Sequence, residues 1–145
     1  MIELEVSGVP APKGSNRAML RGGRAVFVPG GSKVNAIALK SWDASVREAA
    51  GIRSAPAFVA VPLAVSITFR MPRPGGHWGK QGLKASAPQS PAVKPDADKL
   101  ARSTLDSLSG VIFDDDARIV RLTIAKEYAE PGREGATIRV WEHKT

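Results

Sequence analysis

The chain has 145 residues, 43% of them hydrophobic and 24% charged, and a formal net charge of +7. This length suits a single domain, residues 1–145, with its own hydrophobic core, and is short for two domains. Cysteine is absent and only two histidines are present, which excludes disulfide bonds, thiolate chemistry and an ordinary zinc site. Any bound metal is therefore expected to have oxygen ligands, as Mg²⁺, Mn²⁺ and Ca²⁺ prefer.

Neither a membrane span nor a signal peptide is expected. No apolar run approaches the ~20 residues that a transmembrane helix needs, and no basic segment followed by an apolar one begins the sequence. Together with the lack of cysteine, these features favour a cytoplasmic protein with no membrane partner.

Charge is distributed unevenly along the chain. Residues 1–95 contain thirteen Lys and Arg against four Asp and Glu, whereas residues 96–145 contain eight against ten. Six of the seven aspartates lie between Asp96 and Asp116, where only two residues are basic. A pI near 10.1 with clustered positive charge is typical of a protein that neutralises phosphates, although solubility or non-specific binding would also account for it.

The N-terminal segment predicts two strands joined by a loop. Residues 2–6 alternate between apolar and acidic side chains, the pattern of a half-buried strand. Residues 8–23 are rich in Gly, Pro and Arg and are expected to form a basic loop, and residues 24–29 a short strand. A basic cluster here either contacts phosphates or is simply solvated; it comprises Lys13, Arg17, Arg21 and Arg24.

Residues 34–50 predict the first helix. Apolar residues recur at helical spacing, with Ile37 and Leu39 widening the stripe and Trp42 on the side expected to face the core. Ser32 is a candidate N-cap and Gly51 a candidate stop.

The second half predicts a strand, a long loop, a helix and two more strands. Residues 63–70 alternate strictly, and residues 71–95 contain five prolines, four glycines and four basic residues but no acidic one. A helical stripe follows over 97–108, and residues 118–128 and 136–142 are expected to form an antiparallel hairpin. These elements predict an α+β fold with two helices on a small mixed β-sheet and a long basic loop.

Four further side chains have more than one interpretation. His77 and Trp78 either contact DNA or belong to an ordinary mobile loop, which is the simpler reading. Asp106 either pairs with Arg102 one helical turn before it or binds a metal, and the structural pairing is favoured. Trp141 is expected to cover the sheet or a dimer partner.

The aspartates form two clusters, Asp96 with Asp98 at a helix start and residues 114–116 at a strand start. Each aspartate alone is most simply a helix cap or an exposed turn. Taken together, three adjacent carboxylates repel one another unless a positive group lies among them. If the strand packs beside the helix, the two clusters converge, and converging carboxylates are typical of a Mg²⁺ site completed by water and phosphate oxygens.

The segment "KPDADKLARSTLDSLSGVIFDDDARIV" resembles the signature of the RusA-family Holliday junction resolvases of bacteria, phages and prophages. That signature is Asp-x-Asp followed by Asn or Lys and Leu, a helix ending in Asp-Ala-Leu before a glycine, and then Asp-Asp-Ala/Ser-Gln-Val/Ile. The resemblance is dense over residues 94–121, and "PAPKGSNR" at 10–17 is similar to the Pro-rich segment near the family's N-terminus.

The resemblance implies a metal-dependent homodimeric endonuclease that nicks four-way DNA junctions. Its three essential aspartates correspond to Asp96, Asp98 and Asp116, with Asp115 as a neighbouring ligand. The metal implied is Mg²⁺, which Mn²⁺ can replace. Arg102 stands where the family has a helical lysine, so the positive charge is retained, but a guanidinium that stays protonated cannot transfer a proton.

Other positions depart from the family pattern or lie outside it. Lys99 stands where asparagine is common, Arg118 replaces a glutamine, and Asp114 falls outside the motif. The expected DNA-contacting residues are Lys13, Arg17, Lys94, Lys99 and Arg118. Two alternatives remain open: a basic nucleic-acid-binding protein without enzymatic activity, and a less selective metal-dependent nuclease.

Overall fold

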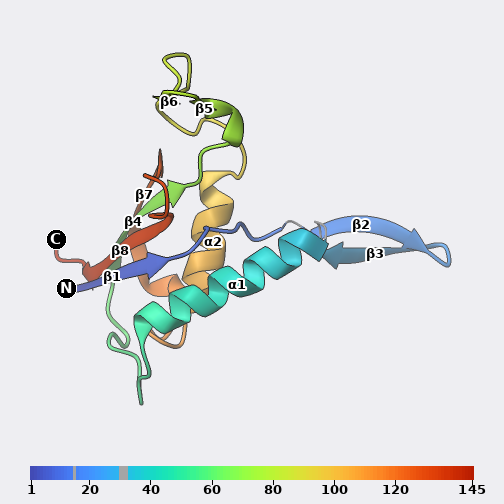
Figure 1. Cartoon of the computed structure of the whole chain (residues 1–145). Helices are drawn as coiled ribbons and strands as arrows, with labels where there is room; N and C mark the ends of the chain where they lie inside the picture. The colour runs from blue at the N-terminus through green and yellow to red at the C-terminus, as the bar shows by residue number, and fades with distance from the viewer. Residues whose placement is uncertain (15, 30–32) are drawn as a thin grey trace.

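The computed structural model describes residues 1–14, 16–29 and 33–145, and for residues 16–21 and 24–29 the backbone alone. Among the described residues, four strands form one mixed sheet (Figure 1). The spatial order is β1 (Ile2–Ser7), β8 (Gly135–Glu142), β4 (Leu63–Met71) and β7 (Ile119–Tyr128). β8 runs antiparallel to both of its neighbours, and β7 runs parallel to β4.

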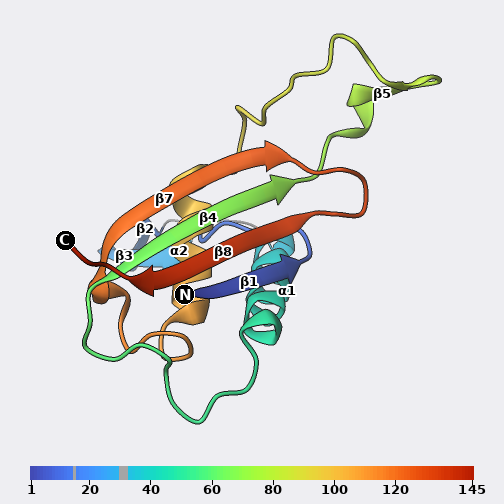
Figure 2. The ribbon, with the colours of Figure 1, turned by 90° about the vertical axis from the view of Figure 1, so that its left-hand side faces the viewer.

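Two helices within the described residues, α1 (Lys33–Ala50) and α2 (Ala97–Leu108), lie on the same face of this sheet. Figure 2 shows the sheet in front and both helices behind it. Trp42 is buried between the helices, and its indole Nε1–H donates to Thr104 Oγ1 at 3.1 Å. The α+β class and the core position of Trp42 are therefore confirmed.

The core forms because alternate side chains of the strands point toward the helices. In β4 the odd-numbered residues are buried and the even-numbered Ser66, Thr68 and Arg70 are only partly buried. The strand residues that face the helices in the core are Leu4, Val6, Leu63, Val65, Ile67, Phe69, Ala136, Ile138 and Val140.

Only the second half of α1 packs on the sheet. Trp42, Val46 and Ala50 are buried, whereas Val34 and Ile37 are 73% and 71% exposed. The expectation that Ile37 widens a core-facing stripe is wrong, because α1 begins away from the sheet (Figure 1). Its end is as predicted: the residue after Ala50 is a glycine at φ 78°, which L side chains rarely adopt. The predicted cap Ser32 lies outside the described residues.

Residues 16–29 form a hairpin, so the expectation of a loop through residue 23 is wrong. β2 (Asn16–Arg21) pairs antiparallel with β3 (Arg24–Pro29). Gly22 and Gly23 connect them with φ values of 59° and 77°. A two-residue turn with both residues at positive φ is a common hairpin connection, and the Gly-Gly pair was its signal in the sequence.

β7 and β8 do not form the expected hairpin, although both strands are where the sequence placed them. β4 lies between them and pairs with each. β4 carries the most continuous apolar run of the sheet, and burial of that run favours a central position. β7 is left at the edge, with most of its side chains exposed.

The segment between β4 and α2, residues 72–95, projects from one end of the sheet and is called the arm here (Figures 1 and 2). It contains a short 3₁₀ turn, Gly75–His77, and a two-stranded ladder of β5 (Trp78–Gly79) and β6 (Gly82–Leu83). The predicted long basic loop is thus present, with a small hairpin at its tip. Neither α-helix of the described residues is long and apolar enough to cross a membrane.

Candidate nuclease site

A pocket of about 230 Å³ lies between α2 and β7. α2 contributes Asp98, Arg102 and Asp106, which recur every four residues and so follow one face of the helix. The turn before β7 contributes Asp116. The floor of the pocket is apolar and consists of Ala101, Leu105, Leu122 and Ile124.

The packing of α2 explains why this face is turned outward. Leu100, Thr104 and Leu108 are buried toward the core, which leaves the opposite side of the helix beside the edge strand β7. As predicted, one aspartate cluster lies at the start of a helix, the other lies directly before a strand, and this strand is in contact with the helix. One aspartate from each cluster, Asp98 and Asp116, reaches the shared pocket.

Asp116 lies in an environment that disfavours its charged form. Partial burial raises its pKa above the usual 3.8, and the carboxylates of Asp115 and Asp106 raise it further. A hydrogen bond from the Ala117 backbone opposes these effects. A cation bound among these carboxylates would relieve their mutual repulsion.

Asp106 pairs with Lys13 and not with Arg102 as predicted. The Lys13 Nζ lies 2.5 Å from Asp106 Oδ2. The N-terminal segment runs along α2, since the Lys13 N–H donates to the Lys99 carbonyl at 3.1 Å and Ser103 Oγ donates to the Ala11 carbonyl at 2.6 Å. Lys13 can reach Asp106 because of these contacts, which no spacing within α2 could reveal.

Arg102 consequently has no ion-pair partner among the described residues. Arg102 lines the pocket, between Asp98 and Asp106 in the helix. An exposed, unpaired guanidinium beside carboxylates is available to a phosphate.

Asp96 and Asp115 do not line the pocket. Asp96 occupies the N-cap position of α2 without a side-chain capping bond, and its Oδ2 lies 3.5 Å from Lys99 Nζ. Asp115 caps the 3₁₀ turn Asp116–Arg118, because its Oδ1 accepts the Ala117 N–H at 2.9 Å.

Asp114 has a structural role, in agreement with its place outside the family motif. Its Oδ2 accepts from Arg118 Nη2 at 3.1 Å and from the Ala60 N–H at 3.3 Å. The hydrogen bond from Arg118 is the main reason why the pKa of Asp114 is lowered. Arg118, a predicted DNA contact, is thereby paired.

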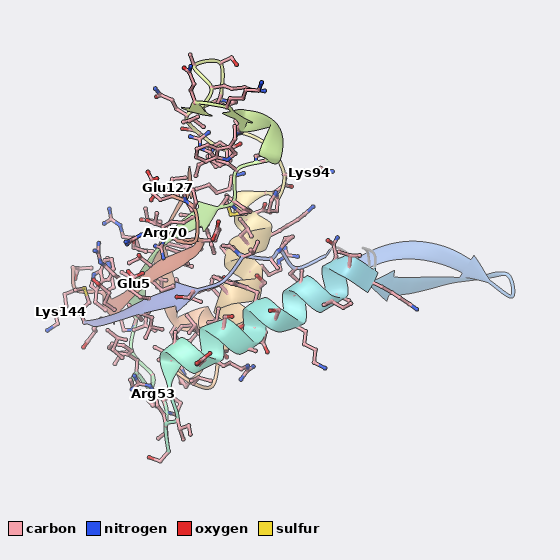
Figure 3. All side chains as sticks on the ribbon, viewed as in Figure 1. Glu5, Arg53, Arg70, Lys94, Glu127 and Lys144 are labelled. Carbon is pink, nitrogen blue, oxygen red and sulfur yellow. The ribbon has the colours of Figure 1, made fainter. Side chains whose placement is uncertain are left out.

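The other residues predicted to contact DNA differ in whether their side chains are free to bind a phosphate. Lys13 and Lys99 are paired with aspartates, as described above. Lys94 is exposed at the base of the arm, beside the start of α2 (Figure 3). The side chain of Arg17 lies outside the described residues.

The donor chemistry of the pocket fits a hard cation. Within the described residues, no three acidic, histidine or cysteine side chains lie close enough together to hold a metal ion. Mg²⁺ does not need such a cage, because it usually keeps several waters and binds one or two carboxylates together with substrate phosphates. Asp98 and Asp116 meet that requirement.

A family model for endodeoxyribonuclease RusA matches residues 8–140 of the chain. The chain belongs to this family. The match confirms the resemblance inferred from residues 94–121 and supports an endonuclease that hydrolyses DNA in recombination. The chain is also similar to a protein of Bacillus subtilis (strain 168), the uncharacterized protein YqaN, with 27% identity over 142 residues and 95% of each chain covered.

Sequence reasoning missed one member of the pocket. Asp106 was interpreted as a structural partner of Arg102, yet its carboxylate lines the pocket and acts on the pKa of Asp116. The signal was present in the spacing of Asp98, Arg102 and Asp106, which places all three on one face of the helix.

Proposed function

We propose that this RusA-family chain is a Mg²⁺-dependent endonuclease that resolves four-way DNA junctions by paired nicks. The observation that carries the proposal is the pocket between α2 and β7, where Asp98, Arg102 and Asp116 meet. Family membership supports the nuclease activity. Dependence on metal, the preference for junctions and the pairing of the nicks are parts of the proposal.

In this proposal Asp98 and Asp116 hold Mg²⁺, which Mn²⁺ can replace, and Asp96 and Asp115 are the next candidate ligands. When bound, Mg²⁺ supplies neutralisation of charge on the attacked phosphate and a water of lowered pKa. The two carboxylates would fix the position of the cation in the pocket. The apolar floor limits the access of water from its side of the pocket and consists of Ala101, Leu105, Leu122 and Ile124.

Arg102 is proposed to stabilise charge on the phosphate. It lies one helical turn after Asp98 and lacks a competing ion pair among the described residues. Its guanidinium can donate two hydrogen bonds to phosphate oxygens. It remains protonated throughout the reaction, so any proton transfer is left to water or to a carboxylate.

Binding of the DNA backbone is proposed for the basic residues around the pocket: Lys13, Arg17, Lys94, Lys99 and Arg118. Lys94 is the most available of those described, since its side chain is exposed and unpaired. Each phosphate contact that a basic residue makes adds to the salt dependence of binding, with a slope of about −0.9 per contact.

A symmetric homodimer is proposed as the working unit. Resolving a junction needs two nicks on strands related by a two-fold axis, and the described residues offer one aspartate pocket per chain. The first half of α1 is a candidate interface, because Val34 and Ile37 are exposed there. The strands near Trp141 are the other candidate.

The deciding experiment incubates the protein with a synthetic four-way junction, a linear duplex and a single strand, each with and without Mg²⁺. Paired nicks in the junction alone, dependent on Mg²⁺ and lost in Asp98→Asn, are expected. Glu130→Gln, which removes an exposed carboxylate beyond the opposite end of β7 from Asp116, is the matched control and should remain active. Binding without cleavage would favour a non-enzymatic DNA-binding protein, and equal cleavage of all substrates a less selective nuclease.

Sedimentation equilibrium at micromolar concentration tests the assembly. A dimer is expected, and Ile37→Glu should weaken it if α1 is the interface. A monomer that makes paired nicks would refute the argument from symmetry.

A further inference from the structure

The tip of the arm presents two apolar side chains to solvent. Trp78 and Leu83 are directly opposite each other in the β5–β6 ladder, and cross-strand partners point to the same face of a hairpin. Trp78 is 37% exposed and Leu83 47% exposed. An indole and a leucine side by side at the end of a projection contribute nothing to the core described above.

The outgoing leg of the arm is fixed to the end of β7. The Arg73 guanidinium carbon lies 4.3 Å from the centre of the Tyr128 ring, and the His77 ring meets the same ring edge-on at 5.4 Å. Arg73 Nη1 also donates to the Pro88 carbonyl at 2.7 Å, which ties the outgoing leg to the returning one. His77 thus braces the arm, while Trp78 next to it is exposed at the tip.

The returning leg is fixed by Lys126, also on β7. Its Nζ donates to the Val93 carbonyl at 2.8 Å and to the Pro95 carbonyl at 2.9 Å. The two legs line one pocket of about 130 Å³ at the base of the arm, together with Lys126 and Tyr128. The arm is therefore a braced projection that leads directly into Asp96 and α2 (Figure 1).

The charge of the arm fits a polyanion. Its basic residues have no acidic counterpart within the segment and are Arg73, Lys80, Lys84 and Lys94. Lys80 and Lys84 are exposed beside the apolar pair at the tip. Aromatic side chains between basic ones are typical of surfaces that stack on nucleic-acid bases.

We propose that the arm recognises the branch point of DNA, with Trp78 stacking on a base that the crossover leaves unstacked and Leu83 packing beside it. The inference rests on the proposed function and adds the feature that selects branched DNA. In an intact duplex the base faces are covered by their neighbours, so Trp78 gains contact only where stacking is interrupted. Because the arm is braced before DNA binds, little conformational freedom is lost on binding.

The test measures binding in EDTA, so that no cleavage occurs, for a four-way junction and a duplex of matched length. Trp78→Ala is expected to weaken junction binding by about 5- to 160-fold, the range for loss of one base–aromatic stack, and to leave duplex binding nearly unchanged. Trp78→Phe should restore most of the affinity. The double variant Lys80→Ala, Lys84→Ala is the matched control, and it should weaken both DNAs and reduce the salt slope by about two.

A fluorescent 2-aminopurine base at the branch point gives a second readout. The wild type should quench it and Trp78→Ala should not, whereas the same base in the duplex arms should be unaffected. Equal junction affinity in the wild type and Trp78→Ala would overturn the inference. So would equal losses for junction and duplex, or a change in the sedimentation of Trp78→Ala, which would make the tip a protein contact.

The two hypotheses fail differently. A wild type that prefers junctions but is indifferent to Trp78 refutes the arm inference alone. A wild type that binds junction and duplex alike, with no Mg²⁺-dependent nicking, refutes the proposed function.

Discussion

Replacing Asp116 with asparagine is expected to stabilise the protein when no divalent metal is present. Burial and the carboxylates of Asp115 and Asp106 raise the pKa of Asp116, which means that folding disfavours its charged form. A neutral asparagine of nearly the same shape removes this repulsion. Because Asp116 is largely exposed, solvent screens the effect, and we expect about 0.2–1 kcal/mol, or about 0.5–4 °C in Tm.

The pH dependence has a defined sign. An aspartate with a raised folded-state pKa has its full contribution to stability below the unfolded value, 3.8, and loses it as the pH rises through the folded-state pKa. The advantage of Asp116→Asn over the wild type should therefore be present at neutral pH. It should fade as the pH falls toward 3.8 and the wild-type carboxyl becomes protonated.

Addition of Mg²⁺ should reverse the order of stability. A ligand that binds only the folded protein at ten times its Kd adds about 1.4 kcal/mol, which corresponds to about 3–6 °C in Tm. The wild type should gain this amount and overtake Asp116→Asn, which should gain little. Thermal unfolding followed by circular dichroism, with and without Mg²⁺, measures both effects without DNA. An equal Mg²⁺ response in the two proteins would refute Asp116 as a ligand.

Asp114→Asn is the matched control, since it removes a carboxylate only two residues away. The pKa of Asp114 is lowered, chiefly by the hydrogen bond from Arg118, so its charge stabilises the fold above the usual pKa. Asp114→Asn should therefore lower Tm at neutral pH, opposite to Asp116→Asn, and the difference should shrink in acid. Its Mg²⁺ response should match that of the wild type.

Three further results are expected. Arg102→Ala should fold normally but cleave about 10²–10³-fold more slowly, with Arg102→Lys recovering much of the rate; a normal rate in Arg102→Ala would make its role structural. Lys126→Met should slow cleavage at least ~10-fold, because Lys126 holds the backbone just before Asp96, and Lys126→Arg should restore activity; unchanged kinetics would show that this anchoring is dispensable. Thr104→Val should cost about 1–3 kcal/mol in urea unfolding by leaving the buried Trp42 N–H unpaired, with cleavage per folded molecule unchanged.

Local patterns in the sequence predicted most elements of the fold. Strict alternation identified β1 and β4, and the helical spacing of apolar residues identified α1 and α2, because these periods follow directly from backbone geometry. The positions of β7 and β8 were predicted for the same reason. The order of the strands in the sheet was not predicted. β4 pairs with both β7 and β8, and this depends on which strand gains most from burial across the whole sheet.

The contacts around the aspartate pocket and at the base of the arm were least accessible from the sequence. Lys13 reaches Asp106 across 93 residues of chain, and Arg73 and His77 meet Tyr128 through the arm. Such pairs depend on the path of loops, for which the sequence carries no periodic signal. The hairpin of residues 16–29 is different, because its Gly22–Gly23 turn is a local signal that the composition of the segment obscured.

The start of α2 sets an order among the predicted metal ligands. Asp98 lies in the first turn of α2, whereas Asp96 precedes the helix as its N-cap and has an extended backbone, so the two side chains are not held on one helix face. Asp98 lines the pocket, and Asp96 at the N-cap lies beside Lys99 instead. Asp98→Asn should therefore abolish the Mg²⁺-induced rise in Tm, whereas Asp96→Asn should reduce it less. Equal loss in both variants would show that Asp96 turns toward the pocket when the metal binds, which would bring the full Asp-x-Asp motif into the site.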